Sequence, residues 1–330
     1  MEGRTSQPPQ KEKGDIMAHQ VESMTYFGQT PWHGLGSTLE ESDRTDWNKV
    51  LVKSGLDWEV EKVPLLTVDG ETIEDRELVR RSSDHKHFGV LSKGYVPLQN
   101  REAFEWFKPW LDAGVAKFET AGSLKGGSVI WALAEIQDIS AEVVPGDAIK
   151  QHILLSNAHD GTLAWSGGFT NTRVVCANTL SQAHKSGASK LLRVRHSKNI
   201  KDNILTVQNS MDLIRQEFSA DVELYKKLAR TSFNQDDVSR LVKKVMFKDE
   251  VELSTRAKNI LEEIVNCVKV SPGSDFAPNT AWNAYNGINY FLLNKAGTKA
   301  DESNRLYSAW FGLNKTNDQN ILNALLQVAA

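Results

Sequence analysis

The chain has 330 residues, of which 40% are hydrophobic, and it carries a formal net charge of −3. This length exceeds one ordinary core and fits one or two domains. The mean hydropathy of −0.41 and the lack of any apolar run of about 18 residues exclude a membrane span. The net acidity is also not that of a generally basic nucleic-acid binder.

The N-terminus and the cysteines indicate where the protein works. Residues 1–23 lack the apolar core of a signal peptide and are expected to form a flexible extension. Cys176 and Cys267 lie in apolar patterns, which is typical of small buried side chains in a reducing compartment. We therefore expect a cytoplasmic protein whose cysteines bind no metal.

Residues 24–195 predict an α+β core built from β-hairpins. Asn100 is expected to cap a helix that Pro109 kinks or shortens. Strand-like runs at 115–122 and 128–139 predict one hairpin, and alternating runs around Asp160-Gly161 predict another. Because these strands follow one another without intervening helices, the pattern argues against a doubly wound parallel sheet.

The stretch TNTRVVCANTLSQAHKS (170–186) predicts a helix over about 172–186. Arg173 would open this helix, where a cation opposes the helix dipole. Asn171, Asn178, Gln182 and Lys185 would share one polar face. Together with Gly167-Gly168, the helix start suggests a phosphate site. The alternative is that Arg173 pairs with a neighbouring carboxylate, such as Glu119 or Glu135 from the strands.

A run of cations continues from this stretch. Residues 185–201 contain no acidic residue and six basic ones, which are Lys185, Lys190, Arg193, Arg195, Lys198 and Lys201. A local basic stripe on an acidic protein is a selective sign of nucleic-acid binding, although a solvated loop is the simpler alternative. Tyr95, Trp131 and Trp165 are candidates for stacking on bases, if they are not core residues.

Residues 196–330 predict a helical region. Apolar residues at steps of three and four from Ile200 to Leu228 predict one long helix with a narrow apolar stripe. Its stripe could pack within the chain or between subunits. The fold class expected is therefore α+β, with antiparallel hairpins packed on helices and a helical C-terminal half.

The sequence contains no P-loop, nucleophile elbow, H-E-x-x-H or C-x-x-C motif. We therefore expect no cofactor, no metal and no catalytic residues. A metal-dependent nuclease that uses His85, His87 and His159 is the enzyme alternative.

Several stretches resemble the phage and plasmid-like family called domain of unknown function 932. They are PWHGLG (31–36), YVPLQNREAFEWF (95–107), ETAGSLKGGSVIWALAE (119–135), NTRVVCANTLSQA (171–183), RHSKNI (195–200) and NTAWNAYNGINYF (279–291). The element order is also similar to the core of single-strand annealing proteins of the eukaryotic Rad type and the phage Redβ type. That likeness is one of fold and carries no shared motif.

These resemblances imply an ATP-independent protein that binds and anneals single-stranded DNA in phage-type homologous recombination. It would form a ring or filament of identical subunits in the bacterial host cytoplasm, with a phage exonuclease as a further partner. The DNA-binding residues expected are Asn171, Arg173, Asn178, Gln182, Lys185, Lys190, Arg193, Arg195 and Lys198. A third possibility is a phage protein that binds a host factor through the acidic segment 39–79.

Overall fold

The computed structural model describes residues 21–28, 36–173, 178–180, 192–208, 214–248, 250–297 and 305–330. Its centre is a mixed sheet in the order β10-β9-β8-β7-β6-β1-β2, and β11 also pairs with β9. Neighbours are antiparallel except β1 and β2. The strands are β1 (Val21–Tyr26), β2 (Ser37–Thr38), β6 (Ala116–Leu124), β7 (Val129–Val144), β8 (Asp147–Ala158), β9 (Trp165–Arg173), β10 (Asn178–Leu180) and β11 (Leu192–Val194).

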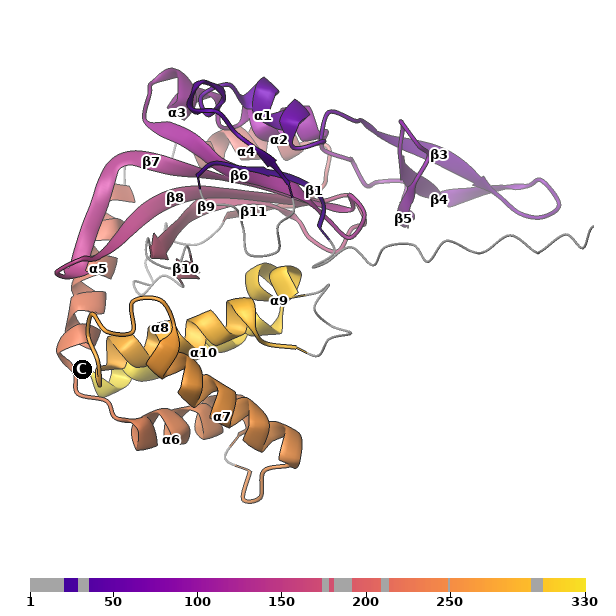
Figure 1. The fold of residues 1–330 in the computed structure, drawn as a ribbon. Coiled ribbons are helices and arrows are strands. Elements are labelled where there is room, and N and C mark those ends of the chain that lie inside the picture. The colour runs from indigo at the N-terminus through magenta and orange to yellow at the C-terminus, as the bar shows by residue number, and fades with distance from the viewer. Residues whose placement is uncertain are drawn as a thin grey trace, which may run out of the picture.

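Four helices cover one face of this sheet (Figure 1). They are α1 (Trp47–Lys53), α2 (Asn100–Glu105), α3 (Lys108–Asp112) and α4 (Ile200–Gln208). Alternate residues of β7 point toward them, so Ala132 and Ala134 share a buried cluster with Phe104 of α2 and Ile204 of α4. The sheet and these helices therefore form one core.

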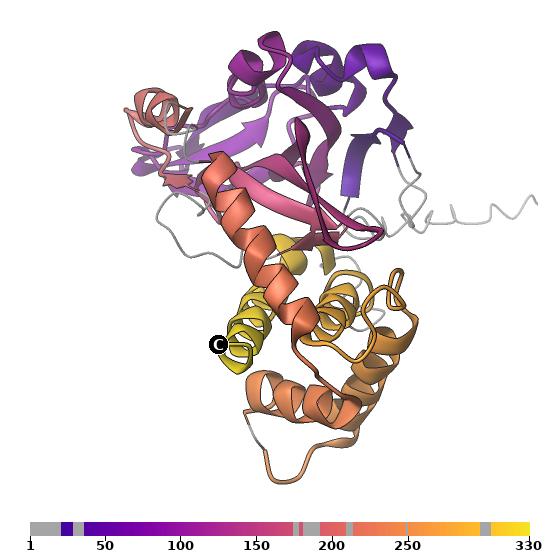
Figure 2. The ribbon, with the colours of Figure 1, turned by 90° about the vertical axis from the view of Figure 1, so that its left-hand side faces the viewer.

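The helical half forms a second core around the far end of the β7–β8 hairpin. Val143 and Ile149 of that hairpin are buried with Phe218, Tyr225 and other residues of the C-terminal helices. Helix α5 runs from the end of the sheet into this half (Figure 2). The helices are α5 (Ile214–Arg230), α6 (Gln235–Met246), α7 (Thr255–Val270), α8 (Ala281–Asn294), α9 (Arg305–Phe311) and α10 (Leu313–Val328).

A small sheet of β3 (Val60–Leu66), β4 (Thr72–Arg81) and β5 (His87–Ser92) projects from the body (Figure 1). Arg81, at the end of β4, ties this small sheet to β1 by donating to Glu22 at 2.9 Å, and it also donates to Asp84 at 2.7 Å. The acidic segment 39–79 runs from the short 3-10 helix η2 (Glu41–Asp43) through α1 into this sheet.

The α+β class, the hairpins and the helical C-terminal half are confirmed. The hairpin around Asp160-Gly161 is β8–β9, and Pro109 separates α2 from α3 by starting a new helix. The predicted flexible extension lies outside the described residues as far as residue 20. Its last three residues belong to β1, which begins at Val21.

The predicted helix over 172–186 is wrong where the structure describes it. Thr172 and Arg173 end strand β9, and 178–180 form β10, which pairs back onto β9. The strand is favoured because β9 pairs continuously with β8, from the pair of Ile149 with Arg173 to the pair of Ser156 with Ser166. β-branched threonines also favour this pleated conformation.

The single helix predicted over 200–228 is also wrong. Helices α4 and α5 bury their apolar residues in different cores, Ile200 and Ile204 beside the sheet and Val222 and Leu228 in the helical half. The stripe of α5 therefore packs within the chain. In the described part of the chain, no helix is both long and apolar enough to cross a membrane.

Candidate nucleic-acid interface

Arg173 lies in a buried ion pair at the end of β9. Its Nε and Nη2 donate to the two carboxylate oxygens of Asp147, both at 2.7 Å. Trp282 donates from Nε1 to the same carboxylate at 2.8 Å. Arg173 is 2% exposed and Asp147 0%, so this Arg173 network of Arg173, Asp147 and Trp282 joins β8, β9 and α8 away from solvent.

The same guanidinium also holds the loop that precedes α8. Nη1 and Nη2 donate to the backbone oxygens of Pro272 and Gly273 at 3.0 and 2.9 Å. Two residues earlier on β9, Asn171 donates from Nδ2 to the carboxylate of Asp221 on α5 at 2.8 Å. The stretch TNTR therefore fastens the sheet to the helical half.

These contacts correct the predicted phosphate site. Arg173 and Asn171 are buried, and no helix begins between them and Leu180 in the described residues. The alternative, a pair with a strand carboxylate, is the arrangement found, but the partner is Asp147 of β8. Glu119 instead accepts from His152, and Glu135 pairs with Arg44 and Lys150. Gly167 serves packing, because a Cβ there would lie 2.4 Å from the Trp165 ring.

The other predicted DNA-binding residues fall into two groups. Gln182, Lys185 and Lys190 lie outside the described residues, and of Asn178 the structure describes only the place in β10. Arg193, Arg195 and Lys198 are described and exposed. We call residues 193–198 the basic segment.

The basic segment begins in β11, at the edge of the sheet beside β9. Arg193 pairs in register with Ser166 and Val194 with Trp165. Because Val194 is buried in the core beneath α4, its strand neighbour Arg193 points to the opposite side. Arg195 directly follows the strand and is also exposed. Among the described residues, no ion pair is made by Arg193, Arg195 or Lys198. Lys201, just beyond them, pairs with Glu102 at 2.5 Å.

A further cation, in the helical half, interacts electrostatically with the basic segment. Partial burial lowers the pKa of Lys315 on α10, and the nearby charge of Arg193 lowers it further, while Asp318 opposes the shift. Two like charges, one at the sheet edge and one on α10, therefore repel each other. Within the described residues Lys315 has no ion pair, which makes this place suited to a bound anion. No sequence pattern pointed to Lys315, because it lies more than 100 residues after Arg193 and only the fold brings the two charges within electrostatic reach.

On the side that faces the core, the basic segment contributes His196 to a set of polar residues that we call the histidine cluster. It consists of Tyr95, Asn100, Asn157, His159 and His196. The Tyr95 ring stacks on His196 with centroids 4.7 Å apart, and its hydroxyl donates to the backbone of Ala158 at 2.9 Å. Thus His196 turns inward while Arg195 and Lys198 beside it stay exposed.

His159 and Asn157 form the floor of the histidine cluster. Both are 0% exposed, and they lie two residues apart on the same side of the β8 chain. The rings of Phe88 and Trp58 pack on the His159 ring, with centroids 5.6 and 5.4 Å from its centroid. Burial lowers the pKa of His159 to about 3, and the nearby charge of His196 acts in the same direction. His159 is therefore neutral across the physiological range.

The nuclease site suggested by the sequence is not assembled. His85 is exposed beside Glu61, His87 is exposed on β5, and His159 is fully buried. Side chains so placed cannot share one ion. Across the described ranges, no group of three or more histidine, cysteine or acidic side chains could hold a metal. Trp131 and Trp165, at 1% and 0% exposure, are core residues rather than stacking platforms.

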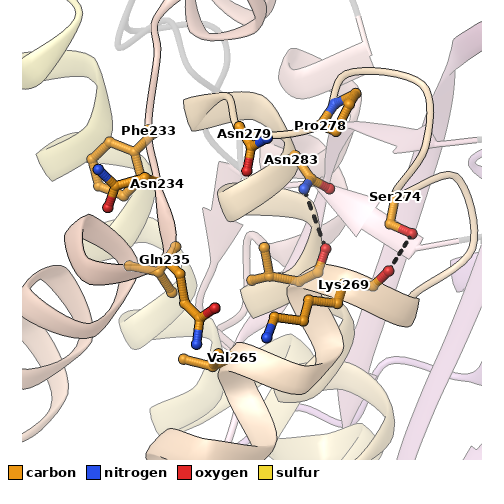
Figure 3. A pocket seen from close by; sticks show the side chains of 11 residues that line it. Phe233, Asn234, Gln235, Val265, Lys269, Ser274, Pro278, Asn279 and Asn283 are labelled. Carbon is orange, nitrogen blue, oxygen red and sulfur yellow. Dashed lines mark hydrogen bonds between the residues drawn. The ribbon is translucent and has the colours of Figure 1, made fainter.

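A half-open pocket of about 250 Å³ lies in the helical half, away from these residues (Figure 3). Phe233 walls one side, and Lys269 and Gln235 extend toward each other at the other. Asn283 and Ser274 are held by hydrogen bonds to the backbone of Val268 and Lys269. No predicted site residue lines it.

No curated protein and no solved structure matches this chain. One family model does match, over residues 87–310, which is more than half of the chain. That range contains the Arg173 network, the basic segment and the histidine cluster, although it ends before Lys315. The chain therefore belongs to the family described as domain of unknown function DUF932.

Proposed function

We propose that this protein binds single-stranded DNA through the basic segment and anneals complementary strands without ATP. The observation that carries the proposal is the set of exposed cations at the sheet edge, Arg193, Arg195 and Lys198, none of which has an ion pair among the described residues. Lys315 adds a fourth charge from α10. Cations without carboxylate partners are free to neutralise phosphates.

In this proposal the DNA backbone follows β11 and the chain after it. Arginine binds a phosphate with two parallel hydrogen bonds, which suits Arg193 and Arg195, and lysine contributes a point charge. Contacts to the backbone alone leave the bases free to pair with a second strand. Asn178, Gln182, Lys185 and Lys190 remain proposed contacts, whereas Arg173 and Asn171 act through the fold.

The wider proposal follows the likeness to single-strand annealing proteins. The protein would act in phage-type recombination in the cytoplasm of a bacterial host. Identical subunits would form a ring or filament, and a phage exonuclease would supply the single strands. The mixed fold, with a sheet covered on one face by helices, is compatible with such a core.

An annealing assay tests this function directly. Two complementary fluorescent oligonucleotides are mixed at low salt without ATP, and duplex formation is followed by energy transfer. We expect wild-type protein to raise the rate, and the variant Arg193→Ala/Arg195→Ala/Lys198→Ala to lose most of this increase.

The matched control is Lys243→Ala/Lys244→Ala, which removes exposed cations from α6 in the helical half. It should anneal as the wild type does. No rate increase and no salt-sensitive binding by the wild type would overturn the proposal. Cleavage that a chelator abolishes would instead support the nuclease alternative, and capture of a host protein without any DNA affinity would support the interaction-protein alternative.

A further inference from the structure

The small sheet of β3, β4 and β5, which we call the arm, ends in an exposed apolar tip. Leu66, Val68 and Ile73 lie at the end of the β3–β4 hairpin, and all three are exposed, Val68 to 105%. Single apolar residues on a surface are normal, whereas a group of them on one projecting element is typical of a contact site. The tip of the arm, residues 66–73, is therefore suited to binding another surface.

Hydrogen bonds within the tip hold it in one shape. Thr67 donates its N–H to the backbone oxygen of Glu71 at 2.8 Å, and Glu71 donates its N–H to Thr67 Oγ1 at 3.0 Å. Nearer the body, Arg80 of β4 donates to Glu61 of β3 at 2.7 Å. A segment that is already ordered loses less conformational entropy when it binds. The Val68 side chain is thus presented on a preformed turn.

The tip also carries negative charge. Asp69 and Glu71 lie on either side of Gly70 in the turn, and both are exposed. Among the described residues neither of these carboxylates makes an ion pair, whereas Glu74, further along β4, pairs with Lys93 at 3.7 Å. A surface that complements the tip would therefore combine an apolar hollow with a cation beside it.

The pocket of Figure 3 has both features. Phe233, Val265 and Pro278 give it an apolar wall, and the exposed Lys269 also lines it. Within the described ranges Lys269 makes no ion pair. The volume of about 250 Å³ is below the range of about 300–1,000 Å³ that is usual for small-molecule sites. The pocket is therefore better suited to one protruding side chain.

We propose that the tip of the arm in one copy of this protein docks in the pocket of a second copy, with Val68 against Phe233 and the tip carboxylates beside Lys269. In one molecule the arm projects from the sheet, and α6 and α7 lie at the far end of the helical half (Figure 1). The tip therefore enters the pocket of another copy and not its own.

This contact joins two different surfaces, so it repeats from copy to copy. Such a head-to-tail contact builds a ring where the rotation closes and a filament where it does not. The inference rests on the assembly of identical subunits under the proposed function, and it identifies the surfaces that form it. The contact itself requires no DNA.

Sedimentation velocity of the full chain without DNA, across a protein concentration series, tests the contact. The wild type should form species larger than one chain. Val68→Asp should weaken association at least about tenfold, because a charge would then enter an apolar pocket at the centre of the contact. The matched control is Val251→Asp, which changes an equally exposed valine (101%) in the helical half and should assemble as the wild type does.

A charge exchange tests the pocket. Lys269→Glu and Asp69→Lys/Glu71→Lys should each weaken association a few-fold, and their combination in one chain should restore it, because the attraction is then reversed in sign but kept. Urea unfolding should show that each variant is folded.

Three results would overturn the proposal. A wild type that stays a single chain at every concentration would mean that the tip binds something other than a second copy. Assembly of Val68→Asp equal to that of the wild type would exclude the tip, and assembly that responds to Val68→Asp but not to Lys269→Glu would exclude the pocket. Because the samples contain no DNA, each of these results is separate from a failure of annealing.

Discussion

Two strands of the same sheet carry arginines in opposite environments. Arg173, at the end of β9, is buried against Asp147 and helps join the sheet to the helical half. Arg193, on the neighbouring β11, is exposed and lies beside another cation. The difference comes from whether a carboxylate is buried within hydrogen-bond reach, which depends on β8 and α10 rather than on the local sequence. A run of cations therefore identifies candidates, and the fold decides which of them remain free.

The largest expected effect is on stability, at Arg173. Arg173→Met leaves Asp147 buried without its cation, and removing one partner of a buried pair costs about 3–5 kcal/mol. Urea unfolding measures this loss. Arg195→Ala should change the unfolding free energy by at most about 0.5 kcal/mol, as is usual for surface sites. Similar values for the two variants would erase the contrast between these arginines.

The second prediction concerns pH and the buried side of the basic segment. The pKa of His159 is about 3 in the folded chain, against 6.5 for an ordinary histidine. As the pH falls below 6.5, the unfolded chain takes up a proton that the folded chain refuses until about pH 3. Stability attributable to His159 is therefore lost over this window, by about 1.4 kcal/mol per pH unit.

Urea unfolding at pH 7, 6 and 5 measures this slope. The wild type should lose more stability than His159→Gln between pH 6 and pH 5, and the two should run parallel above pH 7. A wild-type curve parallel to that of the variant throughout would mean that folding leaves the pKa of His159 unchanged.

The third effect is on DNA binding by the exposed cations. Arg193→Ala/Arg195→Ala/Lys198→Ala should weaken binding of a labelled oligonucleotide at least about tenfold at low salt. On single strands each phosphate contact contributes about 0.7 to the log–log salt slope, so the slope should become shallower by about 2. Fluorescence anisotropy across a salt series measures both. An unchanged slope would place the DNA elsewhere, and urea unfolding should show that the fold is intact.

The smallest effect is expected at Lys315. Lys315→Met removes a partly buried charge that lies beside Arg193. The free protein should become slightly more stable, by less than about 1 kcal/mol, because the like charges no longer repel. DNA binding should weaken by only a few-fold at low salt. An increase in affinity would show that Lys315 faces away from the bound strand.

The sequence predicts much of this fold correctly, because alternation and turn residues report directly on hairpins. The pair Asp160-Gly161 and the strands on either side of it are one example. The failure at 172–186 has a physical cause. The spacing of Asn178, Gln182 and Lys185 favoured a helix, whereas the edge of β8 supplied a ladder that only the tertiary structure reveals.

The candidate site was predictable only in part. The exposed cations of the basic segment were found from charge alone. Asn100 and His159, 59 positions apart, meet because α2 begins beside the end of β8, and no spacing rule indicates that meeting. The polar residues of YVPLQN and RHSKNI were the available signal, since Tyr95, Asn100 and His196 all come from these stretches.

Lysine footprinting tests most directly the claim that the basic segment, and not the Arg173 network, binds DNA. The protein is acetylated briefly with and without a saturating oligonucleotide at low salt, and the modified lysines are quantified by mass spectrometry. Lys198 should be strongly protected by the oligonucleotide and Lys315 partly protected, while Lys243 and Lys244 on α6 should react equally in both samples. Equal modification of Lys198 with and without bound DNA would contradict the account.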